Sequence, residues 1–299
     1  MSSDVSIEEE PLEFDQLGLE RAVRALCKAG IRKTPLTLER VKAWVNQFDT
    51  DAEKTLAWLI LRNLVYRTTE QLESSLRQAL KRATLHFLQT AGVAQSVHWK
   101  DALAGNFPEL NFFCGPPTAS ETSLPGRSGE IVTRWLNRSY RVRKWYPHQI
   151  TTLKPDEFYF VVDDGVYTGE QLRNFLASWG IDYANGKVTI VVGFAHENAL
   201  QDLPAKFPGL TIFSGEVLTE KNGFQSLSAR WIADGQWRHQ ESPYQVYRKL
   251  HLRKGPFELA CPDGFGSLGL MVAFEHGIPD DSLQLLWDRS RNWTPLIER

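Results

Sequence analysis

The stretch Phe158–Leu172, FYFVVDDGVYTGEQL, decides the fold of this chain. Its apolar beginning is typical of a buried strand, and a stretch with helical periodicity begins near its end. Two aspartates and a turn with two glycines lie between them, and glycines let the backbone bend sharply and approach a ligand closely. Backbone N–H groups at a helix start favour an anion. The segment therefore predicts a strand, a ligand-binding turn and the start of a helix.

Short apolar runs alternate with helical stretches on both sides of this segment. The runs are Leu110–Cys114, Phe158–Val162, Val188–Val192, Leu210–Phe213 and Leu270–Phe274. Near-continuous apolar strands separated by helices indicate a parallel sheet that is covered on both faces. We expect an α/β fold with a doubly wound, mainly parallel five-stranded sheet. In such a fold, ligands bind at the carboxyl ends of the strands.

Helical periodicity dominates the chain before residue 105. Thr50 with Glu53, and Thr68 with Gln71, have the spacing of capping boxes, so we expect a helix to begin at each threonine. The first residues are polar and acidic. We therefore expect a flexible acidic tail over residues 1–11, an N-terminal helical module over 12–104, and an α/β domain with a C-terminal extension over 105–299.

The composition argues against several classes of protein. Lys and Arg together number 34, and Asp and Glu 36, so the surface as a whole is not built for nucleic acid. The three cysteines are widely spaced, which predicts neither a disulfide framework nor a zinc site. The sequence shows no secretory signal and no apolar run of membrane-spanning length. We expect a cytoplasmic protein with no membrane partner.

The chemistry of the segment lies in Asp163 and Asp164, which we expect at the carboxyl end of the strand. Carboxylates repel a phosphate, but they accept hydrogen bonds from hydroxyl groups and bind Mg²⁺. A phosphorylated ribose offers hydroxyl groups and a phosphate close together. The alternative interpretation is that the aspartates cap the helix and that the glycines serve only the turn.

Parts of the sequence resemble a known family. Val161–Gly169, VVDDGVYTG, resembles the ribose-5-phosphate loop of type I phosphoribosyltransferases. Phe274–Trp287 and Asn292–Leu296 resemble the tail of a bacterial phosphoribosyltransferase-like family with a C-terminal extension. Members of that family occur beside anti-phage defence genes, including some retron reverse transcriptases. The resemblance implies a type I phosphoribosyltransferase fold and a role in defence against phage.

The resemblance also implies roles for individual residues. Asp163 and Asp164 would meet the ribose 2′- and 3′-hydroxyls, and Arg127 would pair with a pyrophosphate, which makes these the candidate catalytic residues. The ribose-phosphate-binding residues are Asp163, Asp164, Gly165, Val166, Tyr167, Thr168 and Gly169. The candidate pyrophosphate loop is Gly126, Arg127, Ser128 and Gly129, and an ordinary loop with a helix cap is its alternative. The candidate flap residues are Arg141, Arg143 and Lys144, and a solvated edge of the domain is the alternative for this basic run.

Three positions depart from the family pattern, because Tyr167 is bulky and because Glu170 and Gln171 replace small or hydroxyl residues. We expect a phosphoribosyltransferase-like effector of anti-phage defence that transfers or hydrolyses at ribose C1 of a nucleotide-type substrate, with Mg²⁺ near Asp163 and Asp164. The expected partners are a nucleotide or ribose phosphate, and a defence complex that contains a reverse transcriptase and its nucleic acid. The alternatives are a catalytically inactive nucleotide-sensing or adaptor subunit, and a nucleic-acid-binding component.

Overall fold

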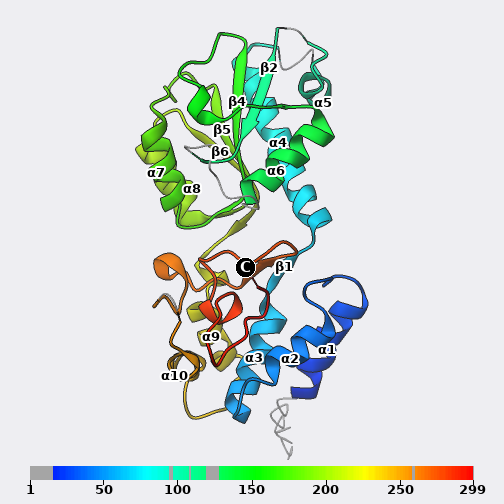
Figure 1. Ribbon diagram of the computed structural model, residues 1–299, viewed down its shortest axis with the longest axis vertical. Coiled ribbons are helices and arrows are strands. Elements are labelled where there is room, and N and C mark those ends of the chain that lie inside the picture. Colours follow the sequence, from blue (N-terminus) through cyan, green and yellow to red (C-terminus); the bar gives the residue numbers. More distant parts are fainter. Residues whose placement is uncertain (1–15, 94–96, 108, 119–127, 258–259, 299) are drawn as a thin grey trace, which may run out of the picture.

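The computed structural model describes residues 16–93, 97–107, 109–118, 128–257 and 260–298, so the expected acidic tail lies outside the described residues. The chain forms two lobes, which lie one above the other in Figure 1. We call the upper one the sheet lobe and the lower one the helical lobe. No helix in the described ranges combines the length and the apolar character needed to cross a membrane.

A parallel sheet of five strands forms the centre of the sheet lobe, as predicted. Its strands lie in the order β3-β2-β4-β5-β6. Their bounds are β2 Asn111–Gly115, β3 Arg143–Lys144, β4 Glu157–Val166, β5 Val188–His196 and β6 Thr211–Leu218. The chain order reverses between β2 and β4, and such a switch point is where doubly wound folds bind ligands.

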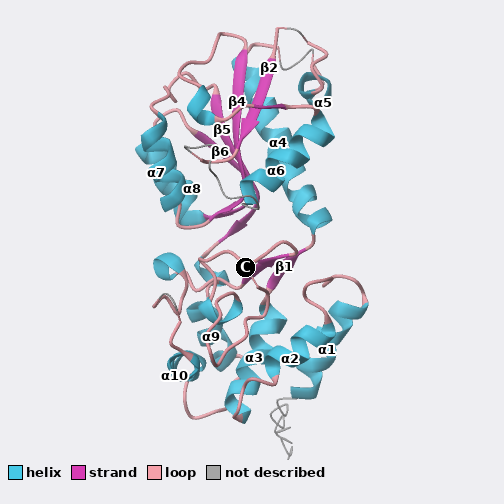
Figure 2. Ribbon diagram, viewed as in Figure 1, coloured by secondary structure: helices cyan, strands magenta, loops and turns pink. Residues whose placement is uncertain are grey.

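Helices cover both faces of this sheet (Figure 2). Alternate residues of a strand point to opposite faces, so Phe158 and Phe160 of β4 join one apolar core while Tyr159 and Val161 join the other. The first core is completed by α4 Thr69–Thr90, α5 Trp99–Leu103 and α6 Ser128–Tyr140. The second is completed by α7 Glu170–Trp179 and α8 Glu197–Lys206. Burial on both faces explains why the strands are apolar almost throughout.

Strand β4 is longer than the sequence predicts. We expected the apolar run to end at Val162 and the two aspartates to follow it, but β4 continues to Val166. Asp163 is paired with Val192 of β5, and Gly165 with Phe194. Because β5 is itself apolar and long, pairing with it holds Asp163, Asp164 and Gly165 in the strand despite their low strand propensity.

The helical lobe is built from both ends of the described chain. Its helices are α1 Gln16–Lys28, α2 Leu38–Val45, α3 Asp51–Asn63, α9 Phe224–Ala233 and α10 Pro243–Lys254. Trp44 of α2 packs edge to face on Trp293 near the C-terminus, with ring centroids 5.8 Å apart. Both predicted capping boxes are confirmed, at the starts of α3 and α4. The described residues of the expected helical module, 16–93 and 97–104, therefore divide between the lobes, since α4 and α5 pack on the sheet.

A two-stranded parallel ribbon lies between the lobes, made of β1 Val65–Arg67 and β7 Val272–Phe274. The run Leu270–Phe274 thus contains a strand, but it pairs with β1, and the fifth strand of the main sheet is β3. Val272 and Phe274 belong to the core of the sheet lobe, whereas Met271 and Ala273 belong to that of the helical lobe. The ribbon therefore ties the two cores together.

Candidate functional site

A cavity of about 840 Å³ lies at the switch point of the sheet. Its wall on the sheet side is formed by the end of β4, the turn that follows it and the start of α6. Residues 276–281, which follow β7, form the wall on the side of the helical lobe. The cavity therefore lies at the boundary between the lobes, at the carboxyl end of β4.

Asp163 points toward the start of α6. Its Oδ1 accepts a 2.6 Å hydrogen bond from Oγ of Ser128, the first residue of that helix. A Cβ on Gly129 would come within 2.8 Å of Pro116, so only glycine lets α6 begin this close to the strand ends. Burial, and then the charge of Asp164, raise the pKa of Asp163 well above its usual range. Asp163 therefore keeps its proton to a higher pH than an exposed aspartate.

Asp164 is buried, and its Oδ2 lies 2.9 Å from Nε2 of His276. The imidazole of His276 stacks on the ring of Phe274, with centroids 5.2 Å apart and planes 6° apart. Because a carboxylate only accepts hydrogen bonds, Nε2 carries the proton in this contact. The helical lobe thus supplies the hydrogen-bond donor that fixes Asp164.

Tyr167 fills the inside of the turn. A Cβ on Gly165 would lie 2.4 Å from Oη of Tyr167, so the ring folds back against the strand and requires glycine there. Only 5% of Tyr167 is exposed, and its hydroxyl has no hydrogen-bond partner among the described residues. Burial and the charges of Asp164, Asp281, Asp163 and Asp280 raise the pKa of Tyr167 well above 10.0. Tyr167, the bulky residue that departs from the family pattern, is therefore an uncharged side chain in the cavity wall.

The backbone N–H of Thr168 donates a 3.3 Å hydrogen bond to Oδ1 of Asp281. Burial, and then the charge of Asp280, raise the pKa of Asp281 to about 6. Gly169 follows in the left-handed region at φ 71°, which favours glycine, and α7 begins after it. An N–H group of the turn that was expected to bind a phosphate thus faces a carboxylate of the protein itself.

The carboxyl groups of the cavity outnumber its cations. Its described lining contains Glu130, Asp163, Asp164, Asp280 and Asp281. Among the residues that the structure describes, the wall has His276 but no lysine or arginine. Glu130 is neutralised by Lys144, whose Nζ lies 2.6 Å from its Oε2. The potential in the cavity therefore favours neutral donors and positive charge over anions.

The structure brings all of the predicted ribose-phosphate residues together, since Asp163 to Gly169 line the cavity. Gly165 and Val166 lie in β4, so the turn itself is restricted to Tyr167, Thr168 and Gly169. Of the predicted pyrophosphate loop, Ser128 and Gly129 line the same cavity. Gly126 and Arg127 lie outside the described residues.

The candidate flap residues lie at the edge of the sheet. Arg143 and Lys144 form β3, where Arg143 bonds to Oδ1 of Asn111 at 2.8 Å and covers the ring of Phe113. Lys144 reaches the cavity indirectly, through its ion pair with Glu130. None of Arg141, Arg143 and Lys144 is part of the cavity lining that the structure describes.

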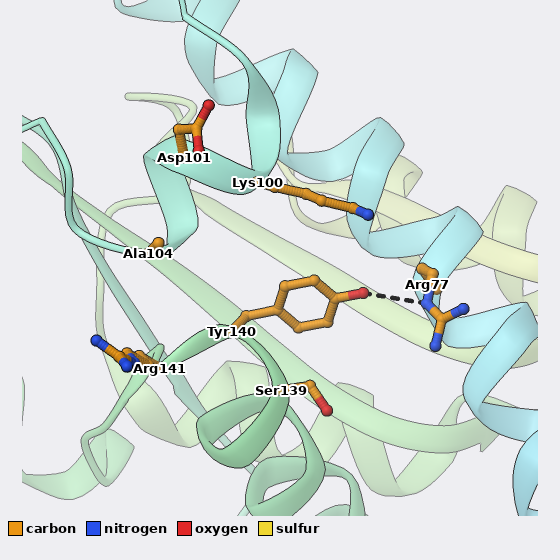
Figure 3. Close-up of a pocket in the computed structure, with 7 residues that line it drawn as sticks. All are labelled: Arg77, Lys100, Asp101, Ala104, Ser139, Tyr140 and Arg141. Carbon is orange, nitrogen blue, oxygen red and sulfur yellow. Dashed lines mark hydrogen bonds between the residues drawn. The ribbon is translucent and has the colours of Figure 1, made fainter.

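Arg141 instead borders a second hollow of about 410 Å³, between α4, α5 and the end of α6 (Figure 3). Nε of Arg77 donates a 3.2 Å hydrogen bond to the hydroxyl of Tyr140 there. In Figure 3, Arg141 lies on the far side of Tyr140 and points away from Arg77. The cations of this hollow therefore do not converge on one point.

The comparison with protein families decides the identity of the chain. A sequence profile of the PRTase-CE family matches residues 41–299. The chain belongs to the PRTase-CE family. Membership in PRTase-CE confirms the predicted phosphoribosyltransferase-like family with a C-terminal extension. No curated protein matches the chain.

The PRTase-CE match includes the residues of the cavity that sequence reasoning did not assign to the site. His276, Asp280 and Asp281 all lie in the C-terminal extension, beyond β7. Their signal was present, because a histidine and a pair of aspartates follow an apolar strand, as the aspartates of β4 do. What the sequence lacked was any sign that this strand ends beside β4.

Proposed function

We propose that the protein binds the ribosyl group of a nucleotide-type ligand in the 840 Å³ cavity and acts at ribose C1, by transfer or hydrolysis. One observation carries this proposal. The neighbouring carboxyl groups of Asp163 and Asp164 lie at the switch point of the sheet, and each is held by a donor, Ser128 or His276. Adjacent acceptors in fixed positions suit adjacent hydroxyl donors, which a ribose has at C2 and C3.

The charge of the cavity supports chemistry at C1. When the bond from C1 to its leaving group breaks, the electron pair departs with the leaving group, and the sugar becomes a positively charged oxocarbenium. Fixed carboxylates around the sugar stabilise that charge as it develops, and an acceptor or water then adds to C1. Asp163 and Asp164 position the sugar in this scheme, and Arg127 is proposed to hold a leaving phosphate.

Magnesium is proposed as a cofactor that arrives with the ligand. Among the described residues, no group of three or more His, Cys, Asp or Glu side chains is arranged to hold a metal ion. Mg²⁺ commonly binds through one or two carboxylates and completes its shell with ligand oxygens and water. Asp163 and Asp164 fit that arrangement, and Mg²⁺ would there neutralise a phosphate that leaves.

Two other functions each have an observation in their favour. A catalytically inactive nucleotide-sensing or adaptor subunit is favoured by the contact of Asp281 with Thr168, which takes up an N–H group of the turn. A nucleic-acid-binding component is favoured by the second hollow, whose border carries three cations, Arg77, Lys100 and Arg141, and one carboxylate, Asp101. Steep weakening of nucleic-acid binding with salt, and its loss in Arg77→Ala, would support the latter.

The proposed cellular role is that of an effector in anti-phage defence, in the cytoplasm, within a complex that contains a reverse transcriptase and its nucleic acid. The resemblance of Phe274–Trp287 and Asn292–Leu296 to the tail of a family whose members occur beside anti-phage genes supports this role. The identity of neighbouring genes, and protection of a host against phage with and without the protein, test it.

The enzymatic proposal is tested with the double variant Asp163→Asn/Asp164→Asn. We expect wild-type protein to bind ribosyl ligands in calorimetry and to change nucleotide pools on expression, and we expect the variant to do neither. A matched control is Asp182→Asn/Asp202→Asn, which makes the same chemical change outside the cavity lining. If pools change equally with the double variant, the reaction does not use these carboxylates and the proposal is wrong.

A further inference from the structure

The protein places a carboxylate of its own, that of Asp281, beside the turn after β4. The N–H of Thr168 donates to Oδ1 of Asp281, and the N–H of Glu170 is bonded to Oγ1 of Thr168 at 3.4 Å. A phosphate seated in this turn would need these N–H groups for its own oxygens. In this conformation, the phosphate would have to compete with a carboxylate that is only 8% exposed.

Asp281 belongs to a fixed part of the structure. The N–H of Leu270 donates to its carbonyl oxygen at 3.3 Å, and the N–H of Phe265 donates to that of Asp280 at 2.9 Å. A Cβ on Gly264 would lie 2.5 Å from the carbonyl carbon of Asp281, and one on Gly266 would lie 2.2 Å from Thr168. The backbone of Asp281 is therefore held in place beside the turn.

The charge and the shape of the cavity also disfavour a phosphate in the turn. Asp280 and Asp281 lie on one wall of the cavity, Asp163 and Asp164 lie on the other, and no described lysine or arginine lines it. A phosphate dianion in the turn meets the carboxylate of Asp281 at short range, where repulsion in a partly buried site is strong. The ring of Tyr167 also occupies the inside of the turn, which leaves less room there for a phosphate.

We propose that Asp281 is a specificity-determining residue, which keeps a phosphate out of the turn and selects a ribosyl ligand whose 5′ oxygen is a free hydroxyl. A 5′-hydroxyl is a donor, so it pairs with the carboxylate that would repel a phosphate. The inference rests on the proposed function and narrows its ligand from a nucleotide type to a nucleoside type. Asp163 and Asp164 keep their proposed role at the other hydroxyls.

The test compares binding of the common ribonucleosides and of their 5′-monophosphates by calorimetry, with and without excess Mg²⁺. For wild-type protein we expect at least one nucleoside to bind roughly tenfold more tightly than its monophosphate, as like-charge repulsion requires. Asp281→Asn keeps an acceptor for the N–H of Thr168 and removes the charge, so it should close this gap by strengthening monophosphate binding. Asp202→Asn, on the exposed side of α8, should leave the gap unchanged.

The outcomes separate this inference from the proposed function. If the monophosphate binds wild-type protein as tightly as the nucleoside and Asp281→Asn changes nothing, Asp281 does not set specificity, while the ribosyl site stands. If neither ligand binds wild-type protein or the variant, both proposals are wrong. Should Asp281→Asn fail to fold by circular dichroism, Asp280→Asn replaces it, and the same direction of change is required.

Discussion

His276 and Asp164 lie 112 positions apart in the sequence, yet their side chains are 2.9 Å apart. The contact joins the C-terminal extension to the central strand of the sheet. It also gives the site a donor that the two aspartates of β4 do not provide. The extension is therefore part of the cavity wall and part of its hydrogen bonding.

The first prediction concerns this contact. His276→Ala leaves Asp164 buried without its donor, so we expect ligand binding to weaken about tenfold or more, because a buried acceptor left unsatisfied costs about 1–3 kcal/mol. His276→Gln keeps a donor and should recover part of the loss. Calorimetry measures both variants. His98→Ala, at an exposed helix start, is the control and should bind as wild type does. Equal binding by His276→Ala and wild type would contradict the role of His276.

The second prediction concerns the unpartnered hydroxyl of Tyr167. Tyr167→Phe removes a buried polar group that has no partner, so we expect the free energy of unfolding to rise by about 1 kcal/mol. Tyr183→Phe is the matched control, because the hydroxyl of Tyr183 donates a 2.7 Å bond to the carbonyl of Leu176 and its loss should lower stability. Urea denaturation measures both. A stability loss in Tyr167→Phe equal to that of the control would show that the hydroxyl is satisfied.

The third prediction is a pH dependence at Asp281, whose pKa is raised from 3.8 to about 6. A carboxyl group with a raised pKa binds more protons in the folded state, so its contribution to stability is present at low pH and is lost as the pH rises toward 6. Relative to Asp281→Asn, wild-type protein should lose about 2–3 kcal/mol of unfolding free energy between pH 4 and pH 7.

Other titratable and polar groups face Asp281 and must be considered when that pH series is interpreted. They are Asp280 beside it, Tyr167 and the N–H of Thr168 across from it, and Asp163, Asp164 and His276 elsewhere in the cavity lining. Taking the difference between wild type and Asp281→Asn removes most of their own titration. If the difference in unfolding free energy between wild type and Asp281→Asn stays constant across this pH range, Asp281 is charged throughout and its burial costs little.

The fourth prediction concerns the ion pair that connects β1 to β6. Nε of Arg67 lies 3.0 Å from Oε1 of Glu216, and the other guanidinium bond is 2.6 Å. Burial alone would raise the pKa of Glu216, but Arg67 and Ser75 outweigh it and lower that pKa. Arg67→Ala should therefore lower the free energy of unfolding by about 1–3 kcal/mol at neutral pH. Most of this difference between the variant and wild type should disappear in acid.

Lys33→Ala is the control for this ion pair, because Lys33 and Glu70 form an exposed contact of 3.3 Å. Exposed pairs contribute about 0–1 kcal/mol, so this variant should change little. Thermal unfolding at neutral and acid pH measures both variants. A similar small loss in the two variants would mean that Arg67 does not tie β1 to the sheet.

Local patterns predicted those parts of the fold that depend on neighbours in the sequence. The capping boxes at Thr50 and Thr68 and the apolar strands belong to this group, because periodicity and capping act over a few residues. The same local patterns predict that β4 ends at Val162, because Asp163 and Gly165 have low strand propensity, but the strand continues to Val166. Pairing with β5 overrides that propensity, and pairing partners cannot be read from a single strand.

The site could be predicted only on its sheet side. Asp163 and Asp164 can be predicted because they follow an apolar run in the sequence. His276 and Asp281 line the cavity because β7 pairs with β1 between the lobes. Leu270–Phe274 was recognised as a strand, but its partner lies about 200 positions earlier in the chain. Long-range pairing of this kind leaves no signature in local spacing.

The contact of Trp44 with Trp293 has a consequence for how the chain acquires its structure during synthesis. The five-stranded sheet and its helices, from α4 to β6, are continuous in sequence and can begin to fold before β7, which completes their core, is synthesised. The core of the helical lobe combines α1–α3 with residues from α9 onward, so it is completed only after the strands of the sheet lobe have been synthesised. The cavity has walls from β4 and from residues 276–281, so it is complete only when those residues have joined the sheet.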